Sequence, residues 1–312
     1  MENLVLSFTV VLPLFIMMVL GYFLKFIKIF DKHTLDKLNS SIFKVFLPIL
    51  IFYNVYTSEI SDVFNPKLIG FSAAAILGVF FLCLIIIPVI EKDNRKRGVL
   101  IQGIYRSNFV IFGIPLSVSL YNEQIQGTTA VLIAVIIPLF NFLAVVSLEI
   151  FRGGKPNFLN ILKGIITNPL IISSAIGFLF LFSKIKLPDV IVSTVKDISK
   201  IATPLALIAL GGSIDFTKIK GNIRQLIIGI SGKLIFTPIL ILTTGILLGF
   251  RNAELAILLS LSASPVAVSS YTMAQQMGGD DDLAAQLLMF GTAVCIFTVF
   301  LWIFILKQLG YM

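Results

Sequence analysis

Five long apolar runs without a single charged residue constrain this chain more than any other feature. They span residues 4–24, 68–90, 124–148, 255–279 and 283–306. A helix needs roughly 20 apolar residues to cross the hydrocarbon core of a bilayer. Only 13% of all residues are charged, whereas a soluble domain carries about 25%. The chain is therefore predicted to be an integral membrane protein with the lipid bilayer as its surroundings.

Five further segments complete a predicted set of about ten transmembrane helices. One is an uncharged run, residues 164–183. Four weaker segments each hold one basic residue, and they lie at 38–58, 98–122, 198–214 and 225–250. No segment alternates apolar and polar residues as a barrel strand must. The predicted fold class is therefore an all-α integral membrane protein.

The basic residues of the loops set the expected orientation. When the loops are taken alternately, one side holds fourteen Lys and Arg and the other holds seven. Lys and Arg stay on the cytoplasmic side. The protein is therefore expected in the cell (plasma) membrane, with both termini on the side away from the cytoplasm. This distribution accounts for the net charge of +8 without nucleic acid as a partner. The loop 184–200, expected outside, fits poorly because it has four Lys.

The loop 277–283 also fits poorly, because it is expected inside and yet contains three successive acidic residues. Carboxylates at the start of a helix accept hydrogen bonds from its free N–H groups and suit its positive dipole end. Asp280, Asp281 and Asp282 are therefore expected to cap the last helix.

A shift of 156 residues, half the chain, brings similar residues of the two halves into register. The aligned pairs are Pro13 with Pro169, Gly21 with Gly177, Lys44 with Lys200, and Pro48 with Pro204. We predict two five-helix repeats, residues 1–153 and 154–312. Because five is odd, the second repeat would be inverted, a common plan for secondary transporters. The alternative is a chance alignment within a chain of low complexity.

The fourth and ninth segments combine helix-breaking residues with polar ones. Freed backbone groups survive in a membrane only where they face protein or a wet cavity. Transporters bind substrate at such breaks, in matching places of the two halves. We therefore expect one shared substrate site, whose residues are Ser107, Asn108, Gly113, Pro115, Asn141, Ser262, Ser264, Pro265 and Ser269. The residues expected to flank it are Pro48, Pro204, Gly211 and Gly212. The alternative is that these Pro and Ser residues only kink helices and line tight helix contacts.

Together these motifs resemble the auxin efflux carrier family, which includes plant PIN proteins and bacterial malate and malonate permeases. The resemblance spans the whole chain. It rests on Phe46-Leu47-Pro48, Tyr105-Arg106-Ser107-Asn108, Gly113-Ile114-Pro115, Asn141 with Glu149, residues 204–212, and Ala263-Ser264-Pro265.

The resemblance implies two inverted repeats with crossing helices four and nine, and transport of a small organic anion, a mono- or dicarboxylate, by an elevator-like motion. A homodimer stays open as the assembly state. Asn108 matches an Asn that family members place near the substrate. Asn141 falls where plant members have an aromatic residue, which favours a smaller and more polar ligand here. Plant members also carry charged residues in the third helix; residues 68–90 have none, so their coupling mechanism is not carried over.

Two basic residues within the predicted segments are expected to draw the anion in from the cytoplasm. Arg106 and Lys233 each lie about eight residues, or about 12 Å, from the cytoplasmic end of a helix. Neither is then expected at the membrane midplane. The alternative is that both side chains simply extend to the lipid headgroups.

Acidic residues are absent from the apolar runs, and Glu123 and Glu149 come nearest. Proton-coupled carriers usually place a carboxylate within the membrane. We therefore expect transport without protonation of a buried carboxylate, with the anion balanced by the positive ends of interrupted helices.

Other function classes receive less support from the residues. His33 is the one His, and Cys83 and Cys295 lie alone within apolar runs, so no catalytic residue, metal ligand set or cofactor motif is predicted. A channel usually shows a repeated filter or a ring of charge, and neither is visible. A channel and a sodium-coupled symporter of related fold nevertheless stay open as alternatives to a carrier.

Overall fold

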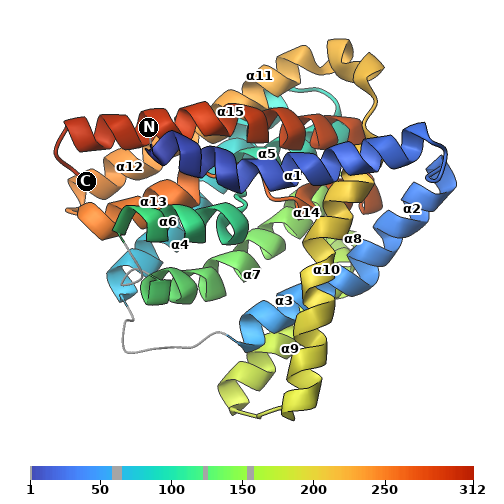
Figure 1. Cartoon of the computed structure of the whole chain (residues 1–312), viewed down its shortest axis with the longest axis horizontal. Coiled ribbons are helices and arrows are strands. Elements are labelled where there is room, and N and C mark those ends of the chain that lie inside the picture. Colours follow the sequence, from blue (N-terminus) through green and yellow to red (C-terminus); the bar gives the residue numbers. More distant parts are fainter. Residues whose placement is uncertain (1, 58–64, 122–125, 153–157) are drawn as a thin grey trace.

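The protein is described here by a computed structural model that covers residues 2–57, 65–121, 126–152 and 158–312. Within these ranges the chain forms helices and no strand (Figure 1). The first half contains α1 (Glu2–Phe26), α2 (Lys32–Ser41), η1 (Ile42–Phe46), α3 (Leu47–Tyr56), α4 (Pro66–Ile90), α5 (Asn94–Tyr105), η2 (Phe109–Gly113), α6 (Ile114–Tyr121) and α7 (Gln126–Ile150). The second half contains α8 (Phe158–Ile166), α9 (Pro169–Ser183), α10 (Asp189–Ser213), η4 (Phe216–Asn222), α11 (Ile223–Ser231), η5 (Gly232–Phe236), α12 (Thr237–Leu247), α13 (Asn252–Ala263), α14 (Ser269–Gln276) and α15 (Asp281–Gln308).

Five helical runs are long and apolar enough to cross a membrane: Lys32–Tyr56, Pro66–Ile90, Val131–Ile150, Thr217–Leu247 and Asp281–Gln308. Shorter apolar helices lie at Leu12–Phe26, Pro169–Ser183 and Asn252–Ala263. Large apolar side chains such as Ile85 and Val89 are exposed along α4, as lipid contact requires. The prediction of a helical, multi-pass membrane protein is confirmed.

Polar side chains fix where several of these helices begin. Asn65 accepts a hydrogen bond from the backbone N–H of Leu68 at the start of α4, and Asn168 does the same for Leu170 in α9. Asp280 accepts one from Leu283 and leaves Asp281 and Asp282 in the first turn of α15. The predicted cap of the last helix is confirmed.

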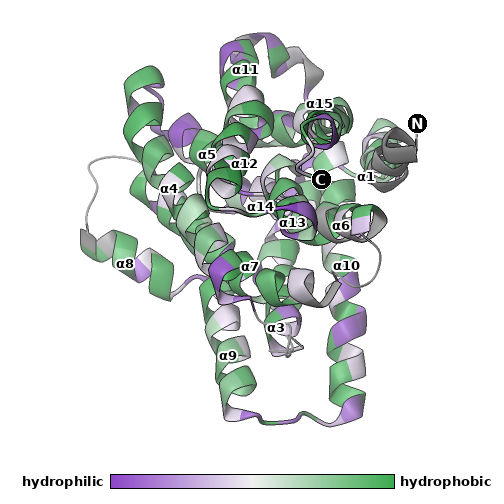
Figure 2. Cartoon of the chain, turned by 90° about the vertical axis from the view of Figure 1, so that its left-hand side faces the viewer, coloured by the Kyte–Doolittle hydropathy of each residue, from purple (hydrophilic) through white to green (hydrophobic). Residues whose placement is uncertain are grey.

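The structure corrects the prediction of a loop over residues 184–200. Helix α10 begins at Asp189, so most of that stretch is helical and only a short connection follows α9. Lys196 and Lys200 are exposed on α10, where Lys200 pairs with Asp197 at 2.9 Å. Figure 2 shows this hydrophilic part of α10 across from α9, with α3 between the two helices, and away from the helices around α13. Hydropathy does not predict these first turns of α10, because helical turns can be polar where they extend past an apolar segment.

Three wide π-helical turns interrupt otherwise regular helices, and each one ends two residues before a proline. They are η1 before Pro48, η2 before Pro115 and η5 before Pro238. Proline has no N–H to donate and its ring clashes with the carbonyl four residues earlier. A widened turn relieves this conflict. The prolines thus decide where the helices bulge, and Lys233 lies in one of these bulges.

One group of helices is held together by glycines at its contacts. Helix α1 packs along α10 and α3 packs along α9. A side chain on Gly211 would overlap the backbone carbonyl of Met18, and one on Gly21 would overlap that of Ile208. Gly177 likewise brings α9 against Val55 of α3. Small residues allow such close approach of helix backbones in membranes.

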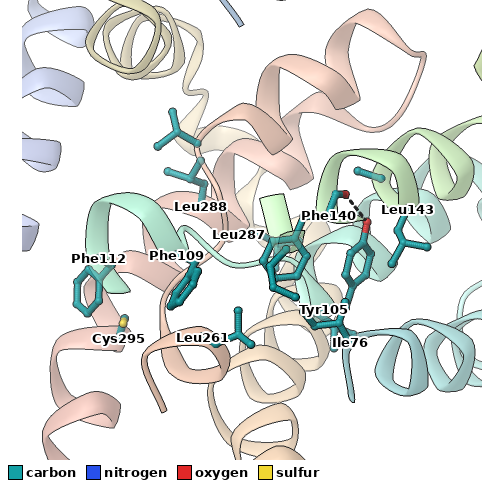
Figure 3. Close-up of a cluster of buried hydrophobic side chains, with 14 of the residues drawn as sticks. Ile76, Tyr105, Phe109, Phe112, Phe140, Leu143, Leu261, Leu287, Leu288 and Cys295 are labelled. Carbon is teal, nitrogen blue, oxygen red and sulfur yellow. Dashed lines mark hydrogen bonds between the residues drawn. The ribbon is translucent and has the colours of Figure 1, made fainter. Parts of the chain in front are cut away.

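Most of the other helices pack around two segments whose helical structure is interrupted, one between α5 and η2 and one between α13 and α14. Figure 3 shows the buried side chains there, with Phe109 and Phe112 near Cys295 and Tyr105 beside Phe140. The Tyr105 hydroxyl donates to the Phe140 backbone carbonyl at 3.3 Å. This core holds the irregular backbone in place.

Candidate functional site

The site is built where two helical runs lose their regular structure. Helix α5 ends at Tyr105 and η2 begins at Phe109; α13 ends at Ala263 and α14 begins at Ser269. Residues 106–108 and 264–268 between these helices are not helical. From the sequence, the first interruption was expected at Gly113 and Pro115. That placement is wrong, because the bulge η2 accommodates Pro115 within helix.

The two interruptions lie directly against each other. The Asn108 backbone N–H donates to the Pro265 carbonyl at 2.8 Å. On one side the Gln102 amide donates to the Ser270 carbonyl at 3.1 Å, which joins α5 to α14. On the other side Ser117 and Ser260 hydroxyls bond at 2.9 Å and join α6 to α13. The Asn108 N–H and the Pro265 carbonyl at the breaks, and the Ser270 carbonyl beside them, are thus paired within the protein.

A cavity of about 100 Å³ opens beside these interruptions. Its polar lining comes from residues of both breaks and from three further helices: Arg106, Ser107, Asn108, Ser269, Asn141, Asn54 and Thr203. Apolar residues of α3, α7 and α10 complete the wall. The cavity therefore lies between the group formed by α1, α3, α9 and α10 and the helices around the interruptions.

Arg106 is the charged residue of this lining. Its side chain is 3% exposed. Its guanidinium donates to the Asn141 carbonyl oxygen at 2.5 Å, to the Ser269 hydroxyl at 2.7 Å and to the Met273 sulfur at 2.9 Å. All of these partners are neutral. Among the described residues no carboxylate lies within 4.0 Å of Arg106, because the ion pairs found there involve Arg152, Lys200 and Lys218.

An unpaired buried charge is unfavourable unless something compensates for it. Neutral hydrogen-bond acceptors hold the guanidinium in place but leave its charge of about +1 in full. The cavity therefore offers a fixed, positively charged and hydrogen-bonding surface, which suits a carboxylate or another oxyanion.

Arg106 and Lys233 are both buried beside the interrupted segments. Each was expected about eight residues, or about 12 Å, from the cytoplasmic end of its helix, where it would draw the anion in. Arg106 lines the cavity, and Lys233 is 1% exposed and donates a hydrogen bond to the Ser107 hydroxyl. The alternative that these side chains extend to the headgroups is wrong, because both end inside the protein.

Other predicted site residues lie close to the cavity without lining it. The Ser262 hydroxyl donates to the Leu258 carbonyl at 2.7 Å, and Ser264 bonds the carbonyl of Ser260, so both close the end of α13. Pro48 and Pro204 each stand next to lining residues in the chain. Gly211 and Gly212 contact α1 and α2 instead. Pro265 contributes its carbonyl to the contact with Asn108.

Two lining residues escaped the sequence argument. Asn54 follows Pro48 by six positions, and Thr203 directly precedes Pro204. A search for polar residues within two turns of the aligned prolines would have found both.

Three carboxylates that could hold a metal ion lie together at the start of α15. Asp280, Asp281 and Asp282 have oxygens within 4.8 Å of one another. Asp280 caps α15 and Asp282 pairs with Lys218 at 2.7 Å. These roles account for two of the three residues, and the cluster does not line the cavity.

Two archaeal proteins are similar to nearly the whole length of this chain. The chain is 23% identical over 304 residues to an uncharacterized transporter of Methanocaldococcus jannaschii, which covers 95% of this chain and 98% of that protein. It is 22% identical over 303 residues to an uncharacterized transporter of Methanothermobacter thermautotrophicus, with 94% and 96% covered. These similarities indicate a membrane transporter rather than an enzyme. The sequence profile described as "Membrane transport protein" matches residues 6–160 and 155–303, and the chain therefore belongs to this family, the auxin efflux carrier family.

Proposed function

We propose that this protein carries a small organic anion, a mono- or dicarboxylate, across the plasma membrane by alternating access. The observation that carries the proposal is Arg106, a buried cation on the cavity wall that has only neutral partners among the described residues. A bound carboxylate would supply the missing negative charge. Charge-assisted hydrogen bonds between Arg and a carboxylate are also about twice as strong as neutral ones.

Helix ends add to this positive charge. The run of η2 and α6 and the helix α14 both begin at the interruptions, so their N-terminal ends lie beside the cavity. Each end is equivalent to roughly half an elementary charge. Together with Arg106 they supply about two positive charges, which suits a monocarboxylate or a dicarboxylate.

The size of the cavity favours a short ligand. Pockets for drug-sized molecules measure about 300–1,000 Å³, whereas this cavity measures about 100 Å³. Its wall contains Asn141 at a position where the resemblance to plant relatives implies an aromatic side chain. A short and polar acid fits this lining better than an indole-sized one.

The glycine contacts support two inverted repeats, residues 1–153 and 154–312. Gly21 of α1 meets α10, and the aligned Gly177 of α9 meets α3. The first helix of each proposed repeat thus packs on the second helix of the other. In this proposal α1, α3, α9 and α10 form a fixed body. The helices around the crossing interruptions slide against it as an elevator, and both termini face away from the cytoplasm.

The proposal is tested with purified protein in proteoliposomes and radiolabelled malate, malonate and acetate. Saturable uptake that an excess of unlabelled short carboxylate inhibits would support the carrier. Flux that rises linearly with concentration would favour a channel instead. Inhibition by an organic amine but by no carboxylate would contradict the anion proposal, and liposomes without protein provide the background.

Asn141→Ala is expected to raise the half-saturating concentration of the substrate about 10- to 100-fold. Its side-chain oxygen holds the Arg106 guanidinium at 2.5 Å, and loss of one partner of a buried charged group costs about 1.5–3 kcal/mol. The measurement is initial uptake rate against concentration. Asn108→Ala is expected to act in the same direction, and Thr298→Ala on the exposed side of α15 serves as the control. A half-saturating concentration unchanged in both Asn variants would contradict their role in the site.

Transport is expected to be independent of a proton gradient. Among the described residues no Asp or Glu lines the cavity, and Glu149 instead pairs with Arg152 at 2.8 Å. Glu123 lies outside the described residues. Uptake is measured under an imposed pH gradient with the membrane potential clamped. Uphill accumulation that follows the pH gradient and disappears in Glu149→Gln would contradict this expectation.

A further inference from the structure

The second buried cation, Lys233, lies near the C-terminal ends of the interrupted helices, where it bonds Ser107 of the cavity lining. It belongs to the bulge η5 and is 1% exposed. The preceding Gly232 brings this bulge against α5, since a Cβ there would lie 2.9 Å from Ile104 Cγ1. Because η5 lies this close to α5, the Lys233 ammonium is positioned at the C-terminal end of α5.

From there a chain of hydrogen bonds reaches the end of α13. The Lys233 ammonium donates to the Ser107 hydroxyl, and that hydroxyl donates to the Leu261 carbonyl at 2.5 Å. Leu261 lies in the last turn of α13, where carbonyls have no partner within the helix. The Lys233 ammonium thus contacts Ser107, two residues after the end of α5, and through that hydroxyl it is linked to a carbonyl at the end of α13.

The charges at this point balance. The C-terminal end of a helix is equivalent to roughly −0.5 elementary charge, and the C-terminal ends of α5 and α13 both lie at the interruptions. Together they amount to about one negative charge, which one ammonium neutralises. Among the described residues no carboxylate lies within 4.0 Å of Lys233, so the helix ends are its counter-charge.

Transporters with interrupted helices often bind a coupling sodium ion at such carbonyl ends. We infer that the Lys233 ammonium is a built-in cation that takes the place of that ion, so that neither the fold nor substrate binding here requires sodium. This inference rests on the proposed function for its consequence in transport, while the occupancy of the carbonyl ends can be tested without any substrate.

The test measures the melting temperature of purified protein in 100 mM sodium chloride and in 100 mM choline chloride, with no organic acid present. The wild type is expected to melt at the same temperature in both. Lys233→Ala opens space at the carbonyl ends, so sodium is expected to raise its melting temperature by about 3 °C, as a site with a Kd near 10 mM would. Lys233→Arg keeps the cation and is expected to be indifferent to sodium. Lys44→Ala, which removes an exposed Lys from the bulge η1, is the matched control.

Lys233→Gln is measured alongside in case the Ala variant does not fold. A wild type stabilised by sodium would overturn the inference, and so would Lys233→Ala and Lys233→Gln variants that fold and ignore sodium. If sodium sensitivity appears only in the neutral variants but no carboxylate is transported, the inference stands and the proposed substrate class fails.

Discussion

Replacement of Arg106 by Gln is expected to raise the half-saturating concentration of the transported anion at least about 100-fold, or to abolish transport. Removal of one partner from a buried charge pair costs about 3–5 kcal/mol, and each 1.4 kcal/mol is a factor of ten. Arg106 would form such a pair with the bound carboxylate. The measurement is saturable uptake into proteoliposomes, with the melting temperature of each variant recorded to show that it folds.

Salt distinguishes a binding residue from one that only attracts the anion from solution. Screening weakens interactions between exposed charges but affects buried ones much less. Because Arg106 is buried, the effect of Arg106→Gln is expected to be equally large at 20 mM and 500 mM salt. If the effect of Arg106→Gln on the half-saturating concentration vanishes at high salt, Arg106 does not bind the anion in the site. It would then only attract the anion from solution.

Two further variants serve as controls for charge and geometry. Arg106→Lys keeps the positive charge but loses the planar fork, so we expect an intermediate loss of affinity. Arg152→Gln removes an exposed cation from the end of α7, where it pairs with Glu149. Wild-type uptake is expected in that variant, and a similar loss in both Gln variants would show that net charge alone matters.

Gly211→Ala is expected to lower the melting temperature by about 5–10 °C. One added methyl group would overlap the backbone carbonyl of Met18, and a helix backbone cannot move aside as a flexible side chain can. Overpacking of this kind costs about 1–3 kcal/mol or more, and each kcal/mol lowers the melting temperature by about 2–4 °C. The melting temperature of the purified variant in detergent is the measurement.

Gly78→Ala provides the matched control on α4. Nothing lies within 4 Å of a Cβ at that position, and Ala favours a helix by about 1 kcal/mol over Gly. No decrease in melting temperature is expected. If Gly211→Ala and Gly78→Ala melt at the same temperature, the close contact of α1 with α10 does not determine the stability of this fold.

The apolar runs were sufficient to predict that this protein lies in a lipid bilayer and that its elements are helices. Uncharged runs such as residues 68–90 have few alternatives to a helix in a bilayer, because each backbone group there must bond within its own segment. The prolines also mark the widened turns before Pro48, Pro115 and Pro238 and the break that contains Pro265, since a residue that lacks an N–H disturbs any helix it enters. They did not locate the break at residues 106–108. Ser107 and Asn108 were predicted at the site as polar residues of a segment that also holds helix-breaking residues. Four of the predicted site residues, Ser107, Asn108, Asn141 and Ser269, line the cavity.

Tertiary structure alone decided what the two basic residues do. Distance along a helix suggested that Arg106 and Lys233 lie away from the centre, but the side chain direction depends on which neighbour each helix meets. The widened turn η5 and the close contact at Gly232 direct Lys233 to Ser107. Helix packing likewise decides which residues of α10 reach the cavity. Gly211 contacts α1, whereas Thr203 lines the cavity. Periodicity along one segment carries no information on such contacts, because they join residues far apart in the chain.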